Sequence, residues 1–199
     1  METAEAMQKR RSIRKYTDEP VSKEDLDFLM HCAMSGPSAV NRRPWDFYIV
    51  TDPKVLEELR KASRYTNIVS PCAIVVCGNL SRALPMQLSE FWVQDCSAAT
   101  ENILLGAVSI GLGTVWCGIH PQKNAVKKVS AALNLSTKQI PLNIMSLLHY
   151  WWVNHFSDSY KITACSVNTS TVAGCFASLI KARTKSRSGG SIRNDRREW

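Results

Sequence analysis

The sequence lacks the motifs that identify several common classes of protein. It has no G-x-x-x-x-G-K-[ST] loop, no second glycine that would make a serine-hydrolase elbow around Ser38, and no C-x-x-C pair among its seven cysteines. Its four histidines, at positions 31, 120, 149 and 155, show no H-E-x-x-H or other ligand spacing. These absences argue against a P-loop nucleotidase, a serine hydrolase, a disulfide framework and a metal centre.

The sequence also lacks a long uninterrupted apolar run. Its longest apolar stretch, from Trp92 to Trp116, contains Gln94, Asp95, Glu101 and Asn102. A membrane span is therefore not expected. Residues 1–10 are polar and do not resemble a secretory signal, so we expect a cytoplasmic protein. A length of 199 residues allows one domain with a sizeable core.

Positive charge is unevenly distributed along the chain. Residues 1–146 hold 17 Lys and Arg against 14 Asp and Glu, a net of +3, whereas residues 147–199 hold 8 against 3, a net of +5. The basic character therefore belongs largely to the C-terminal part, and no nucleic-acid partner is inferred from the global charge. Nucleic-acid binding through this tail stays a minor alternative, because the run lacks interleaved aromatic residues.

The order of periodic segments predicts an α+β fold. Helices are expected after Ser22, after Pro53, over 89–110 and over 121–133, and strands over 46–50, 73–77, 114–119 and 140–147. The continuous apolar run 73–77 indicates a central strand that is buried on both faces. The small residues Ser97, Ala98 and Ala99 would let another backbone approach the long helix closely.

Two features have ordinary structural interpretations. The segment Gly111-Leu112-Gly113-Thr114-Val115-Trp116 begins like a dinucleotide fingerprint, but it follows a helix and has Trp116 in place of the third glycine. We interpret it as a helix C-terminus in which glycines adopt left-handed angles. The cysteines are expected to be buried free thiols, and Cys72 and Cys77 are expected to point to opposite faces of one strand.

Two short segments carry the chemistry. The first, Arg10-Arg11-Ser12-Ile13-Arg14-Lys15, places four cations and a hydroxyl in six positions, which suits a phosphate ester. A solvated helix end is its simpler interpretation. The second, residues 35–45, is a turn of small residues that includes Asn41, whose amide offers a donor and an acceptor to a pyrimidine-like edge. Together they predict a planar phosphorylated cofactor.

With further motifs, these segments resemble the nitroreductase family of FMN-dependent oxidoreductases. The match covers about residues 5–147 and is specific as an ordered set. Its other pieces are Pro71-x-x-Ile74-Val75-Val76, Asp95-x-x-x-Ala99-x-x-x-Ile103-Leu104-Leu105, Gly111-Leu112-Gly113-x-Val115-Trp116 and Ile140-Pro141-Leu142.

The resemblance implies an α+β fold with a central, mostly antiparallel sheet flanked by helices, in a homodimer with FMN at the interface. It implies NAD(P)H as co-substrate and nitroaromatic- or quinone-like electron acceptors, and it requires no catalytic side chain. Cys117 is interpreted as a packing or pocket-lining residue rather than a redox thiol. The cofactor residues that it implies are Arg10, Arg11, Ser12 and Arg14 for the phosphate and ribityl chain, Pro37, Ser38, Ala39 and Asn41 from the other subunit, and Val115, Trp116, Cys117 and Gly118 along the reactive edge.

The C-terminal residues depart from this pattern. We expect residues 1–147 to form the FMN-binding domain and residues 148–199 to be an atypical basic tail, disordered or the product of a shifted reading frame or fusion. A changed tail would weaken the dimer and FMN binding. Two other functions stay open: another flavin reaction on the same scaffold, such as dehalogenation or flavin breakdown, and flavin binding without turnover.

Overall fold

The computed structural model describes residues 1–15, 17 and 19–149. The helices of this part are α1 (Thr3–Lys9), α2 (Lys23–Met34), α3 (Pro53–Arg60), α4 (Phe91–Ser109) and α5 (Lys123–Ala132), with short 3-10 turns η1 (Ala39–Asn41) and η2 (Met86–Leu88). The strands are β1 (Trp45–Val50), β2 (Cys72–Asn79), β3 (Leu112–Gly118) and β4 (Gln139–His149). None of the helices in this part of the chain is long and apolar enough to cross a membrane.

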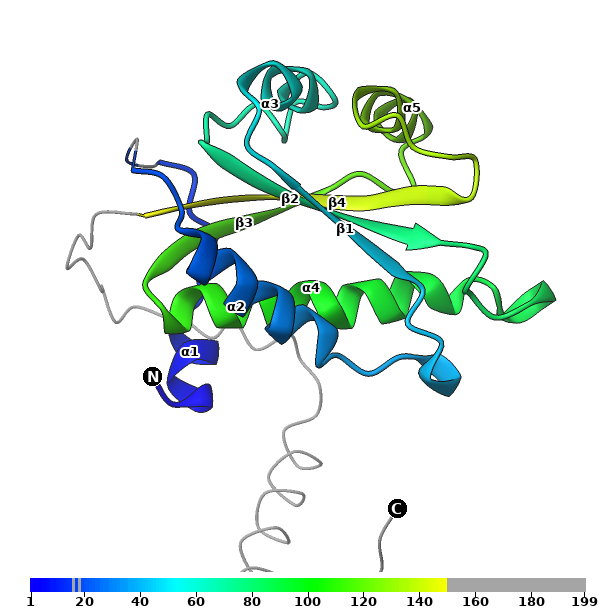
Figure 1. Cartoon of the computed structure of the whole chain (residues 1–199), viewed down its shortest axis with the longest axis horizontal. Coiled ribbons are helices and arrows are strands. Elements are labelled where there is room, and N and C mark those ends of the chain that lie inside the picture. Colours follow the sequence, from blue (N-terminus) through cyan, green and yellow to red (C-terminus); the bar gives the residue numbers. More distant parts are fainter. Residues whose placement is uncertain (16, 18, 150–199) are drawn as a thin grey trace, which may run out of the picture. The chain divides into compact units, whose positions relative to one another are not determined.

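The four strands form one antiparallel sheet in the order β1-β2-β4-β3. Helices α2 and α4 pack on one face, and α3 and α5 cover the other (Figure 1). The sheet therefore lies between two apolar cores, and alternate residues of the strands point into one or the other, except where the register of β4 against β2 shifts near Leu142. The expected α+β fold with an antiparallel sheet and flanking helices is confirmed.

Strand β2 is buried over most of its length, from Cys72 to Gly78. Ile74 and Val76 contribute to the core beneath α4, whereas Ala73 and Val75 contribute to the core beneath α3 and α5. The continuous apolar run correctly predicted a strand covered on both faces.

Local signals in the sequence set several helix ends. The hydroxyl of Ser22 accepts the N–H of Asp25 at the start of α2, and Pro53 lies in the first turn of α3 after the capping carboxylate of Asp52. Gly111, with a φ of +82°, ends the long helix in the left-handed conformation that was expected there.

The structure differs from the sequence-based expectation at two strand ends. Strand β3 begins at Leu112, so Gly113 lies within the strand, opposite Leu148, instead of ending the helix. Strand β4 continues past Leu147 through Leu148, which is fully buried, to His149. An apolar core position at 148 extends the strand beyond the change in composition. The remainder of the expected tail, residues 150–199, lies outside the described residues.

The five cysteines in the described part of the chain are free thiols, and all but Cys32 are buried. Burial raises the pKa of Cys72 to about 11 and that of Cys77 to about 12, so these groups stay protonated near neutral pH. Within the described ranges, no three His, Cys, Asp or Glu side chains gather into a group that could hold a metal ion. Cys165 and Cys175 lie outside these ranges.

Candidate functional site

The basic segment lies against the edge strand of the sheet. Helix α1 ends at Lys9 with Arg10 as its C-cap, and the chain then continues so that Ser12 forms a parallel bridge with Thr114 of β3. The backbone N–H of Ile13 donates to the carbonyl oxygen of Thr114 at 2.9 Å. Segment 10–14 is thereby fixed to the strand that carries the predicted residues 115–118.

Arg14 is also electrostatically linked to a residue of β3. Its exposed side chain donates from Nη1 to the carbonyl of Ser12 at 3.4 Å. Burial raises the pKa of the Cys117 thiol, and the nearby Arg14 guanidinium partly opposes this effect. The charge of Arg14 therefore acts on Cys117. Both are predicted site residues, and they are far apart in the sequence.

The guanidinium of Arg11 is held by backbone carbonyls. Its Nη1 donates to the carbonyl oxygens of Gln8, at 2.6 Å, and Arg10, at 2.8 Å. Arg10 and Arg11 are half-buried, whereas Ser12 and Arg14 are exposed. The segment thus concentrates guanidinium donors and a hydroxyl at one edge of the sheet, which is the donor set that a phosphate ester requires.

Strand β3 presents its residues to two different environments. The side chains of Val115 and Cys117 lie in the core beneath α3 and α5, and Trp116 packs toward the core beneath α4. Val115 and Cys117 are nearly inaccessible, so they can reach a ligand only through their backbone. At Gly118 an added Cβ would meet nothing within 4 Å. The end of β3 therefore offers open, accessible backbone.

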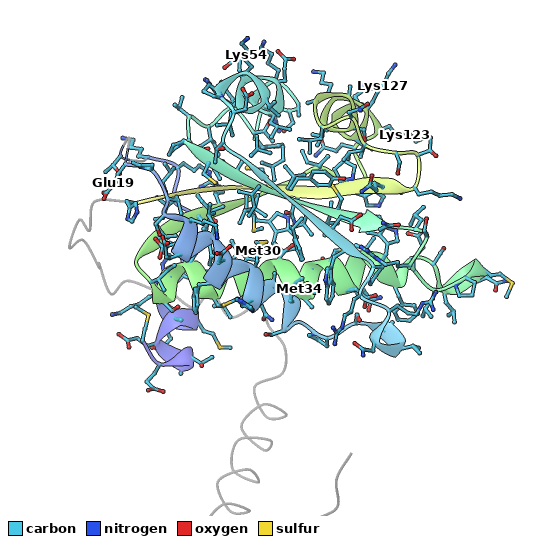
Figure 2. The ribbon with its side chains drawn as sticks, viewed as in Figure 1. Glu19, Met30, Met34, Lys54, Lys123 and Lys127 are labelled. Atoms are coloured by element: carbon cyan, nitrogen blue, oxygen red, sulfur yellow. The ribbon has the colours of Figure 1, made fainter. Side chains whose placement is uncertain are left out.

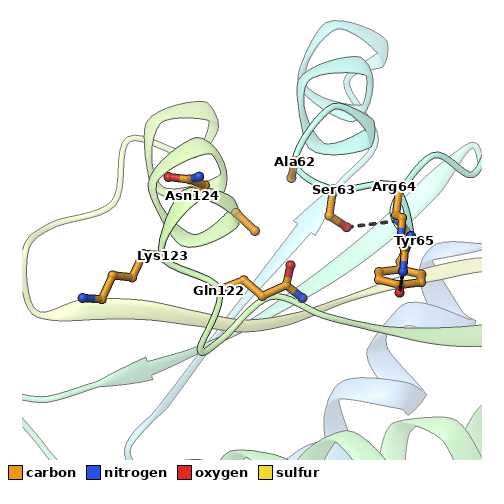
Figure 3. A pocket seen from close by; sticks show the side chains of 8 residues that line it. Ala62, Ser63, Arg64, Tyr65, Gln122, Lys123 and Asn124 are labelled. Atoms are coloured by element: carbon orange, nitrogen blue, oxygen red, sulfur yellow. Dashed lines mark hydrogen bonds between the residues drawn. The ribbon is translucent and has the colours of Figure 1, made fainter.

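An open pocket of about 910 Å³ lies beside this strand end, between the loop after α3 and the start of α5 (Figure 3). The thiol of Cys117 donates to the backbone carbonyl of Tyr65 at 3.1 Å, which connects the pocket wall to β3. The pocket is lined by Ala62, Ser63, Arg64, Tyr65, Gln122, Lys123, Asn124 and Ala125.

The charged groups of this pocket are basic. The Arg64 guanidinium carbon lies 4.6 Å from the centre of the Tyr65 ring. Lys123 and Lys127 lie on α5, in the same layer as Lys54 of α3 (Figure 2). A volume of this size is typical of small-molecule sites, and its charge favours an anionic ligand.

The second predicted segment forms a tight turn docked on α4. The backbone N–H of Ala39 donates to the Asp95 carboxylate at 2.8 Å. Gly36 lies so close to α4 that an added Cβ would come within 3.2 Å of the Ala99 nitrogen. The expectation that small residues on α4 admit a second backbone is confirmed for this contact.

The structure attaches segment 10–14 to the strand of residues 115–118, and it places the 37–41 turn at the other end of α4 from α1, the helix that leads into segment 10–14. The turn lies at Asp95, and α1 lies beside Gly106 on the same helix, opposite ends of α4 in Figure 1. Asp95 and Gly106 are eleven positions apart on the helix, which is about 16 Å along its axis.

Sequence reasoning did not assign a site role to Asp95 or to the Arg64–Tyr65 loop. A signal for Asp95 was available in the sequence, because it is the one acidic residue among the mostly apolar and small residues from Phe91 to Thr100, and the structure buries it at 7% exposure. Such a buried charge requires a partner. The loop after α3 carries no comparable signal.

The fold and the site define an α+β protein whose edge strand joins a basic segment to an open pocket. Comparisons with known proteins identify the family to which the chain belongs. A model of the nitroreductase family matches residues 7–76 and 70–147. A protein of Methanothermobacter thermautotrophicus named "Putative NADH dehydrogenase/NAD(P)H nitroreductase" is 41% identical over 149 residues, which are 74% of this chain and 76% of that protein. The chain belongs to the nitroreductase family and is an oxidoreductase of that type.

Solved structures agree with this assignment. A protein of the same name from Parabacteroides distasonis is 38% identical, with a TM-score of 0.71, and the match covers 75% of this chain and 87% of that one. A "putative nitroreductase in complex with FMN" from Desulfovibrio desulfuricans is 27% identical, with a TM-score of 0.64, over 74% of this chain and 85% of that one. The second structure bears out FMN as the expected cofactor type.

Proposed function

We propose that this chain binds FMN and passes electrons from NAD(P)H to small acceptors of the nitroaromatic or quinone type. The observation that carries the proposal is the attachment of segment 10–14 at Thr114 to β3, the strand that ends in the open backbone at Gly118. When bound, FMN supplies the redox chemistry, accepting a hydride and passing electrons on. The role of the chain is to bind and orient the cofactor and the substrates and to exclude water from the site.

The residues present fit this cofactor. Arg10, Arg11 and Arg14 would neutralise the phosphate, and Ser12 would hydrogen-bond a phosphate or ribityl oxygen. The backbone of residues 115–118 would line the reactive edge, since Gly118 leaves room for a flat ring to approach. The neighbouring pocket would receive the nicotinamide and then the acceptor, because it opens beside the same strand end.

The protein does not need a reactive thiol at this site. Burial raises the pKa of Cys117, and its Sγ–H is engaged by the Tyr65 carbonyl at 3.1 Å. A thiol that stays protonated is a poor nucleophile. We therefore assign Cys117 to packing and name no catalytic side chain.

The proposal includes a homodimer in which each cofactor site is shared. Residues 37–41 would come from the second copy, which is consistent with their separation from segment 10–14 along α4. Met7, Phe28 and Met34, which are 58%, 41% and 45% exposed, give α1 and α2 an apolar surface that a second copy would cover. The FMN-binding part would be residues 1–147, since the family match ends there.

The test uses the purified full-length protein under anaerobic conditions. We expect it to be yellow after incubation with FMN and gel filtration, and to bleach when NADH or NADPH is added. Reoxidation by a nitroaromatic or a quinone would complete the cycle. A protein that stays yellow with either nicotinamide would support flavin binding without turnover, and failure to retain FMN would overturn the proposal.

A further inference from the structure

The turn that carries Asn41 is held in a conformation that its residues rarely adopt. Val40, Asn41 and Arg43 have φ values of 51°, 52° and 47°, all in the left-handed region, and none of them is glycine. Val40 is β-branched and 80% exposed, so burial of its side chain does not offset the strain. Strain of this kind persists only where the surroundings enforce it, and it concentrates at functional sites.

Two side chains hold the turn by accepting its backbone N–H groups. From α4, the Asp95 carboxylate accepts the backbone N–H of Ala39 at 2.8 Å. From within the turn, the Ser38 hydroxyl accepts the backbone N–H of Arg43 at 2.9 Å. Asp95 is buried and belongs to the rigid long helix, so it fixes the turn to the body of the protein.

A third contact sets the polarity of Asn41. The Nε–H of Arg43 donates to Asn41 Oδ1 at 2.9 Å. The amide oxygen already accepts one hydrogen bond inside the turn, so the Nδ2 group of this exposed residue is the more available part for a ligand. This refines the expectation that Asn41 offers both a donor and an acceptor.

We propose that Asp95 is a positioning residue, which holds the strained 38–43 turn so that Asn41 meets the flavin as a hydrogen-bond donor. This inference rests on the proposed function for the identity of the ligand. The hydrogen bond between Ala39 and Asp95 is itself present in the chain without any ligand. Pre-forming the turn lowers the conformational cost of binding, because the strain is already present before the ligand arrives.

The test titrates apoprotein variants with FMN and follows the quenching of flavin fluorescence. Asp95→Ala removes the acceptor for Ala39 and should raise the Kd for FMN by about tenfold or more. Asp95→Asn keeps an oxygen in place and should stay within about threefold of the unaltered protein. Ser38→Ala loosens the same turn from its solvent side, where it cannot disturb the core, and should also weaken FMN binding. Asp27→Ala, an exposed carboxylate paired with Lys23, is the matched control and should leave the Kd unchanged.

Asn41→Asp tests the polarity. Aspartate tolerates the left-handed φ and keeps an oxygen for Arg43, but it replaces the Nδ2 donor with a second acceptor. We expect it to abolish tight FMN binding. Retained binding would overturn the assigned polarity.

Hydrogen exchange of the Ala39 amide provides a readout that does not depend on FMN. It should be slow in the unaltered protein and in Asp95→Asn, and fast in Asp95→Ala. An Asp95→Ala variant that is merely less stable, with an unchanged Kd, would overturn the positioning role, as would an Asp95→Asn variant as weak as Asp95→Ala. If the unaltered protein failed to bind FMN, the proposed function would be wrong, while the exchange pattern would still decide the role of Asp95.

Discussion

The backbone N–H of Ile13 donates to the carbonyl oxygen of Thr114 at 2.9 Å, and this bond joins the basic segment to the edge of the sheet. The two residues lie about a hundred positions apart in the sequence. Because Thr114 is 1% exposed, the bond is anchored in a rigid part of the fold. The arginines on either side of Ile13 are consequently presented from a fixed backbone, which reduces the entropy lost when an anion binds.

The first prediction concerns Arg14. Arg14→Ala should leave the fold intact, because the side chain is exposed, and should weaken FMN retention by about ten- to a hundredfold through the loss of a charge-assisted hydrogen bond. Equilibrium dialysis against FMN measures the effect. Lys15→Ala removes the same charge at the next position and should have a much smaller effect. Equal losses from both variants would show that only the local charge matters.

The second prediction tests whether two chains share each site. Arg14→Ala and Asn41→Asp homodimers should each bind FMN weakly. In a hybrid dimer, one of the two sites combines the intact basic segment of one chain with the intact turn of the other. Random mixing after unfolding and refolding should therefore restore about a quarter of the sites, since a two-fold axis pairs each segment with the opposite chain.

Visible absorbance after gel filtration measures this recovery. The matched control refolds each variant alone and should restore none. A mixture that binds no more FMN than its components would place both segments in one chain, contrary to the proposal.

The third prediction contrasts a glycine of β2 with a glycine of β3, two strands that lie on either side of β4. A Cβ at Gly78 would lie 2.1 Å from the Trp92 ring, and Trp92 is 2% exposed. Gly78→Ala should therefore lower the free energy of unfolding by about 1–3 kcal/mol through overpacking. Gly118→Ala meets nothing within 4 Å and should unfold at the same denaturant concentration as the unaltered protein.

The same Gly118→Ala protein should nevertheless retain less FMN, because the added methyl group occupies the space through which a flat ring approaches the strand. Urea denaturation and FMN dialysis on both variants separate the two effects. A Gly118→Ala variant with unchanged FMN retention would remove the end of β3 from the proposed site.

The sequence predicted those features of the structure that neighbouring residues determine, and it did not predict those that depend on contacts between distant segments. Ser22, Pro53 and Gly111 act on their own neighbourhoods, so the corresponding helix ends were predicted correctly. The bridge between Ser12 and Thr114 pairs distant segments, and no local pattern encodes it. The antiparallel sheet came from the family resemblance rather than from periodicity.

The strained turn is a second feature that local sequence patterns could not predict. Left-handed angles at Val40 and Arg43 have no sequence signal, because glycine is the residue that normally marks them. They arise from contacts with Asp95 and Ser38, which exist only in the folded chain. Similarly, Leu148 belongs to a strand because the core covers it, although the composition changes at that position.

The last prediction concerns the pH dependence of stability through Asp46. Burial alone would raise the pKa of this carboxyl group, but hydrogen bonds from Gln139, at 2.8 Å, and Asn79, at 2.9 Å, and the Arg82 guanidinium together hold it below its ordinary value. A carboxyl group with a depressed folded pKa stabilises the fold above its unfolded pKa, and the contribution is lost as pH falls through the folded pKa.

Asp46→Asn should therefore lower the free energy of unfolding by about 1–2 kcal/mol at pH 7, and the difference from the unaltered protein should shrink below about pH 4. Asp52→Asn is the matched control, because asparagine caps α3 about as well as aspartate, and it should be neutral at pH 7. Urea denaturation between pH 3 and pH 7 checks both, and a difference for Asp46→Asn that stays constant across this range would contradict the assigned cause.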